Sequence, residues 1–135
     1  MSAREVEFRV DGKPQPKGSA RAVKSKSTGK AILLMGSDAP SARRLKSWAA
    51  AVAWSARAAW RGDPARGAVH LTMRFWMPGK SIRPPDLDKL DRAVLDAMTG
   101  IVYVDDAQVV SIDSDKDGPS RSPGALIRIF AEVDA

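Results

Sequence analysis

Two pairs of aspartates are the residues of this sequence whose type and spacing best suit chemistry. Asp86 and Asp88 stand two residues apart, directly after two prolines, and Asp105-Asp106 follows a short apolar stretch. A hard divalent cation such as Mg²⁺ prefers a few carboxylates and keeps several of its waters. Asp86, Asp88 and one of the second pair would therefore make a reasonable magnesium site if the two stretches meet in space.

The chain offers few other routes to catalysis. It contains no cysteine and a single histidine, His70, which excludes disulfides, thiolate nucleophiles and histidine-rich metal sites. A general base needs partners within reach, and none is evident beside His70. The run Lys17-Gly18-Ser19 lacks the glycine that a phosphate-binding P-loop needs at position 17, which argues against a nucleotide cofactor.

The first aspartate pair also has a purely structural explanation. Aspartate is a preferred N-cap residue, and acidic groups near a helix start interact well with the helix dipole. Asp86 and Asp88 point to one side only if the helix begins after Asp86, an arrangement that the preceding prolines favour. A bound metal would also explain how acidic groups in a basic protein can face phosphate, because the ion reverses the local charge.

Two cations follow the first pair, and each has two interpretations. Arg92 is four positions after Asp88, so the two side chains can form a helix ion pair worth about a few tenths of a kcal/mol. Alternatively, Arg92 or Lys89 lies beside the phosphate and stabilises developing negative charge. Arg92 cannot act as a base.

The charge balance favours a polyanionic partner. The chain has 22 Lys and Arg against 16 Asp and Glu, a formal net charge of +6, which suits nucleic acid or, as an alternative, an anionic membrane surface. Residues 13–30 carry no acidic residue and are rich in Pro, Gly and Ser, so we expect a flexible basic loop that is either a solvated connector or a phosphate-gripping arm. Its candidate DNA contacts are Lys13, Lys17, Arg21, Lys24 and Lys26.

Hydrophobic periodicity predicts one mixed α/β (α+β) domain across residues 1–135, with two main helices. Strands are expected at 5–10, 31–35, 69–77, 101–104, 108–112 and 125–133, and helices at about 41–60 and 87–98. The acidic run 113–118 resembles the opening of a calcium loop but lacks its final glutamate, so we interpret it as a polar turn. With no long apolar run and no signal peptide, a cytoplasmic protein is expected.

Three segments together resemble the RusA family of Holliday-junction resolvases. They are Pro85-Asp86-Leu87-Asp88-Lys89-Leu90, Leu95-Asp96-Ala97-Met98-Thr99-Gly100 and Asp105-Asp106-Ala107-Gln108-Val109. The early Pro14-x-Pro16-Lys17-Gly18 and the downstream Lys116 are similar as well. The resemblance spans most of the chain in order, and the spacing between the aspartate pairs is specific.

The resemblance implies a homodimeric, magnesium-dependent endonuclease of bacterial or phage origin that cuts four-way DNA junctions, with Mn²⁺ as the substitute ion. It implies that Asp86, Asp88 and Asp106 bind the metal and carry catalysis, with Asp105 as a helper and Lys116 as a DNA contact. The chain departs from the family pattern at Lys89, where asparagine is frequent, and at Arg92, where a functional lysine is usual. Two alternatives stay open, namely a non-catalytic DNA-binding protein and a metal nuclease for flaps or other branched DNA.

Overall fold

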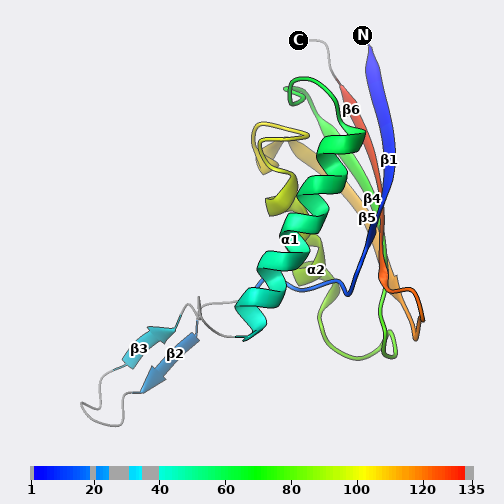
Figure 1. Cartoon of the computed structure of the whole chain (residues 1–135). Coiled ribbons are helices and arrows are strands. Elements are labelled where there is room, and N and C mark those ends of the chain that lie inside the picture. The colour runs from blue at the N-terminus through cyan, green and yellow to red at the C-terminus, as the bar shows by residue number, and fades with distance from the viewer. Residues whose placement is uncertain (1, 19–20, 25–30, 35–39, 133–135) are drawn as a thin grey trace.

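A mixed sheet with helices on one face forms the body of the protein (Figure 1). The computed structural model describes residues 2–18, 21–24, 31–34 and 40–132, and within them four strands are ordered β1-β6-β4-β5. Their bounds are Ala3–Asp11 for β1, Val69–Trp76 for β4, Val109–Asp117 for β5 and Gly124–Glu132 for β6. Helix α1 spans Pro40–Ala59 and α2 spans Leu87–Met98. This is the single α+β domain that the sequence predicts.

The pairing of the strands explains where α2 lies. β1 and β4 both pair antiparallel with β6, whereas β4 and β5 are parallel. A parallel pair needs a crossover connection, and α2 with its flanking turns provides it. Because α2 crosses between α1 and β5, its first turns lie beside the C-terminal half of β5.

The core lies between the sheet and the helices, as the predicted alternation requires. Buried side chains from the sheet include Val10, Val69, Leu71, Met73, Phe75, Ile127 and Ile129, and those from the helices include Trp48, Val52, Leu90, Val94 and Met98. Trp60 is buried just after α1, whereas Trp54 is 77% exposed. Two of the three tryptophans in and near α1 therefore belong to the core, as expected for a helix with apolar periodicity.

The expected strand at 101–104 is wrong. Gly100 has a φ of +86°, and its amide donates to the carbonyl of Tyr103 at 2.7 Å, so the chain turns directly after α2. Val102 and Tyr103 are fully buried beneath the end of the helix. The apolar run marks a buried turn because its side chains fill the core without strand pairing beyond isolated bridges at Tyr103.

The expected polar turn at 113–118 is also wrong, because β5 continues to Asp117. The strand lies at the edge of the sheet, where side chains on its outward face reach solvent. Arg74 on the neighbouring β4 lies 3.3 Å from Asp115 and 3.8 Å from Asp117, so the acidic residues have a cationic neighbour on their own sheet face. Alternating charge is compatible with such a half-exposed edge strand.

The basic segment 13–30 is not irregular throughout. Residues Arg21–Lys24 form β2, which pairs antiparallel with β3 at Ala31–Leu34, close to the strand expected at 31–35. Lys26 lies outside the described residues. Among the residues that the structure describes, no helix has the length and apolar character needed to cross a membrane.

Candidate active site

Asp86 and Asp88 lie at the start of α2 with their side chains exposed. Asp86 is the N-cap residue, with extended backbone (φ −67°, ψ 143°), and its carbonyl accepts from the amide of Leu90 at 3.2 Å. Its carboxylate makes no capping hydrogen bond within the described residues. Helix capping therefore does not account for this carboxylate, which is exposed two residues before the exposed Asp88.

Lys116 fixes the segment that leads into α2. Its ammonium donates to the carbonyl oxygens of Arg83 at 2.8 Å and Pro85 at 2.7 Å. An ammonium has three donors, so these two bonds use most of its capacity. The sequence predicted that Lys116 contacts DNA; the structure instead places its charged group on the backbone just before Asp86, and the DNA contact stays a prediction.

Asp91 is a further carboxylate on α2, three residues after Asp88 and on the same face of the helix. The sequence interpretation did not include it. The hydroxyl of Ser114 on β5 donates to its Oδ2 at 2.8 Å, while its Oδ1 is buried without a hydrogen-bond partner in the described part of the chain. Burial raises the pKa of Asp91; the Ser114 hydrogen bond lowers it and the charge of Asp88 raises it further. The spacing of three residues from Asp88 was the available signal.

Lys89 and Arg92 are both exposed on α2. Within the residues that the structure describes, neither side chain forms an ion pair, so the helix pair of Asp88 with Arg92 is not made. The carbonyl of Lys89 accepts a hydrogen bond from the amide of Lys17 at 3.0 Å, which joins the segment after β1 to the first turns of α2. Both cations are therefore available to a ligand at the start of α2.

The second aspartate pair is divided between two roles. Asp105 caps the short helix η1 (Asp106–Gln108), because its carboxylate accepts from the amide of Ala107 at 2.9 Å. The amide of Asp105 donates in turn to the side-chain oxygen of Gln108 at 3.0 Å, which completes a capping box. Both aspartates are exposed, but the carboxylate of Asp105 is engaged in this capping bond.

The two pairs lie toward opposite ends of α2. The hydroxyl of Tyr103, a residue three positions before Asp106, donates to the carbonyl of Leu95 at 2.6 Å. Burial raises the pKa of this tyrosine, and the nearby charge of Asp106 raises it further. Asp106 therefore lies near the last turns of α2, while Asp86 precedes Leu95 by nine residues, about 13 Å of helix. Within the described residues, no three acidic or histidine side chains are grouped so that they can hold a metal ion. One protomer does not bring Asp86, Asp88 and Asp106 together.

The predicted DNA contacts of the basic segment have different environments. Lys13 is exposed, whereas the ammonium of Lys17 forms an ion pair with Asp96 on α2. Arg21 and Lys24 belong to β2. Because Asp96 partly offsets the charge of Lys17, Lys13 is better placed than Lys17 to bind a phosphate.

Comparison with known proteins agrees with the resemblance that the motifs indicate. The chain matches the family described as Endodeoxyribonuclease RusA over residues 11–130. The match includes both aspartate pairs, the segment after β1 and Lys116. No curated protein matches the chain.

Proposed function

This chain belongs to the RusA family of Holliday-junction-resolving endodeoxyribonucleases, and on that premise we propose that it is a magnesium-dependent homodimer that cuts four-way DNA junctions. The observation that carries the proposal is the carboxylate of Asp86, which stands at the N-cap of α2 without capping it, two residues before the exposed Asp88 in the first turn. An uncommitted acidic pair on a protein of net charge +6 is explained by a cation that it shares with the DNA.

The donor set fits a hard cation. Mg²⁺ is usually bound through one or two protein carboxylates together with phosphate oxygens and water, and Asp86 and Asp88 are the two that would hold it here. When bound, the ion supplies an activated water and offsets negative charge on the phosphodiester; Mn²⁺ is the expected substitute. Zinc would want nitrogen or sulfur ligands, which this part of the chain lacks.

The residues around the pair have separate tasks in this proposal. Lys116 holds the backbone before Asp86 and so orients the first turn of α2. The exposed cations Lys89 and Arg92 follow the carboxylates on that helix and bind the phosphate, where a fixed positive charge favours the developing negative charge. Because a bound metal would itself lower the pKa of water, such a site would not depend on a histidine or cysteine.

Asp106 enters the proposal through the partner subunit. The two aspartate pairs lie toward opposite ends of α2, so a site that contains both must take them from different protomers. A two-fold dimer exchanges identical groups between its subunits and would build two such sites. Two sites also suit a four-way junction, because paired cuts in two strands resolve it.

A cleavage assay tests the proposal directly. Labelled four-way, flap and linear DNA are incubated with the wild type or Asp88→Asn, in Mg²⁺ or EDTA. We expect the wild type to cut the four-way junction in Mg²⁺ alone, and Asp88→Asn to bind it without cutting. Binding without cleavage by both proteins would support a non-catalytic DNA-binding protein. A preference for flaps would support a metal nuclease that acts on other branched DNA. Equal cutting by both proteins would exclude Asp88 from the site.

A further inference from the structure

A groove of about 640 Å³ lies between the turn that follows β1 and the first half of α1. Its lining includes Gly12 and Lys13 from the turn and Arg43, Arg44 and Trp48 from the helix. We propose that this β1–α1 groove binds the phosphate backbone of one duplex arm of the DNA. The inference rests on the proposed function and adds a DNA-contacting surface to it.

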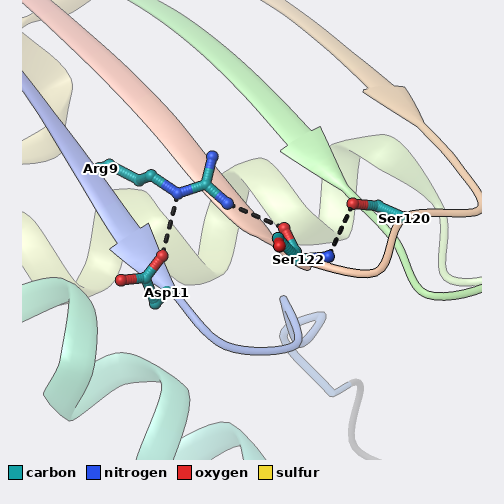
Figure 2. Close-up of polar contacts among 4 residues, drawn as sticks. All are labelled: Arg9, Asp11, Ser120 and Ser122. Atoms are coloured by element: carbon teal, nitrogen blue, oxygen red, sulfur yellow. Dashed lines mark hydrogen bonds and ion pairs between the residues drawn. The ribbon is translucent and has the colours of Figure 1, made fainter.

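The charges of the groove favour an anion. Lys13, Arg43 and Arg44 are exposed cations from two separate elements that line one cavity. Among the described lining residues, Asp11 is the acidic one, and the guanidinium of Arg9 donates to its carboxylate at 2.9 Å (Figure 2). Arginine in particular matches the geometry of phosphate oxygens. The groove therefore presents a net positive surface.

The carboxylate of Asp11 pairs with Arg9, whose guanidinium has a second hydrogen-bond partner. A second nitrogen of Arg9 donates to the carbonyl of Ser122 at 2.8 Å, and the amide of Ser122 donates to the hydroxyl of Ser120 at 3.1 Å (Figure 2). Arg9 is thus anchored to the turn before β6 while it pairs with Asp11. This arrangement offsets the negative charge at the edge of the groove and lowers its repulsion of phosphate.

The shape of the groove depends on Gly12 and Trp48. Gly12 has a φ of +123°, a conformation that residues other than glycine rarely adopt, and it makes the turn that follows β1. Trp48 is only 3% exposed, and its ring carbons lie 4.0 Å from the position of a Cβ at Gly12. The buried ring therefore packs against this turn and lines the groove together with the cations. The first turn of α1, which contains no acidic residue, adds the positive end of the helix dipole.

The groove is close enough to the aspartates for one DNA arm to reach both. Lys13 and Lys17 are four residues apart, at most about 14 Å, and the amide of Lys17 lies 3.0 Å from the carbonyl of Lys89 on α2. The groove and the first turns of α2 are therefore within about 17 Å, or roughly five base steps along a duplex. Backbone held at the groove would keep the neighbouring phosphates at Asp86 and Asp88.

The test measures binding of a fluorescent four-way junction in EDTA across a series of salt concentrations. The variant Arg43→Ala/Arg44→Ala removes two groove cations, and its matched control Lys46→Ala/Arg57→Ala removes two exposed cations of α1 outside the groove lining. Each lost phosphate contact lowers the slope of log K against log salt by about 0.9. We expect the groove variant to lose roughly 1.8 from the slope and at least tenfold in affinity at moderate salt.

The control variant should keep nearly the wild-type slope, and Arg43→Lys/Arg44→Lys should restore most of the loss because it retains the charge. Equal losses in both alanine variants would overturn the proposal, since net charge alone would explain them. An unchanged slope with altered sedimentation of the groove variant would identify a subunit contact and overturn it as well. A wild type that neither binds nor cuts junctions defeats the proposed function instead. Thermal unfolding of every variant confirms that it is folded.

Discussion

Asp86 and Asp105 both occupy N-cap positions, yet only Asp105 uses its carboxylate to cap. The oxygen of Asp105 accepts from the amide of Ala107 at 2.9 Å, whereas the side chain of Asp86 makes no such bond within the described residues. The same residue type at the same helical position therefore has two different side-chain environments. The carboxylate of Asp86 is therefore left free of capping, as the proposed metal site requires.

Alanine substitution should separate the two roles. Asp105→Ala is expected to lower the free energy of unfolding by about 1 kcal/mol, because a capping bond is lost. Asp86→Ala should change stability by less than about 0.5 kcal/mol in EDTA and abolish cleavage in Mg²⁺. Urea unfolding measures the first quantity, and junction cutting measures the second. If Asp86→Ala destabilised the protein as much as Asp105→Ala, the carboxylate of Asp86 would be structural.

Lys116 should affect catalysis more than DNA binding. Lys116→Ala removes both bonds to the carbonyls of Arg83 and Pro85, so the segment before Asp86 loses its anchor. We expect a loss of stability of about 2 kcal/mol and at least tenfold slower cutting at saturating enzyme, with the salt slope of junction binding unchanged. The control is Lys80→Ala, which removes the same charge from an exposed residue of the segment that contains Arg83 and Pro85.

A different result would return Lys116 to the role that the sequence suggested. If Lys116→Ala lowered the salt slope by about 0.9 while bound junction was cut at the wild-type rate, its ammonium would contact a phosphate. Arginine at position 116 distinguishes the cases further. Lys116→Arg keeps the charge but not the compact ammonium that two carbonyl oxygens share. If Lys116 anchors the backbone, this variant should cut as slowly as Lys116→Ala; if Lys116 contacts a phosphate, it should restore the wild-type salt slope.

Asp91 makes stability depend on pH. Burial raises the pKa of Asp91 above the ordinary value of 3.8. The hydrogen bond from Ser114 on β5 lowers this pKa, and the charge of Asp88 on α2 raises it. The native state therefore holds this proton more tightly than the unfolded chain, and the free energy of unfolding falls as pH rises from about 3.8 through the raised native value. Asp91→Asn does not titrate and is free of this loss.

Urea unfolding of both proteins in EDTA between pH 4 and pH 8 checks this sign. The stability of Asp91→Asn relative to the wild type should increase as pH rises and level off above the native pKa of Asp91. A constant difference across the range would mean that the carboxyl titrates alike in both states. Ser114→Ala is a second probe. Without the Ser114 hydrogen bond the pKa of Asp91 should rise further, so the stability of this variant should fall more with rising pH than that of the wild type.

Local patterns predicted the fold well where packing follows the chain. The alternation of Val69, Leu71, Met73 and Phe75 correctly predicted β4, and the apolar spacing of α1 and α2 placed both helices to within a residue or two. The same reasoning failed at Val102, where apolar side chains fill the core from a turn. Periodicity reports burial, but burial alone does not distinguish a strand from a packed turn.

The site was only partly visible in the sequence because its contacts are distant along the chain. The bond of Ser114 to Asp91, the ion pair of Lys17 with Asp96 and the anchoring by Lys116 all join residues far apart in sequence. Spacing singled out the aspartate pairs, yet it gave no sign that they lie toward opposite ends of α2. That separation depends on the direction in which α2 crosses from β4 to β5.

The separation leads to a prediction about mixed dimers. If each site takes Asp86 and Asp88 from one protomer and Asp106 from its partner, a dimer of one Asp88→Asn and one Asp106→Asn protomer has one site with both substitutions and one intact site. We expect both homodimers to be inactive and the mixed dimer to nick. Two affinity tags and tandem purification provide the mixed species, and a cruciform plasmid reports on it, since one active site gives nicked circles and two give linear DNA.

The matched control is a mixed dimer of Asp86→Asn and Asp88→Asn protomers, which has one substitution in each site whichever subunit supplies Asp106. It should be as inactive as the homodimers. Were the Asp88→Asn/Asp106→Asn dimer equally inactive, each site would need all three residues from a single protomer. That result would contradict the assignment of Asp106 to the partner. The assignment rests on the position of Asp106 near Tyr103 and the last turns of α2, away from Asp86. Nicking by the mixed dimer alone would establish a site built from two subunits.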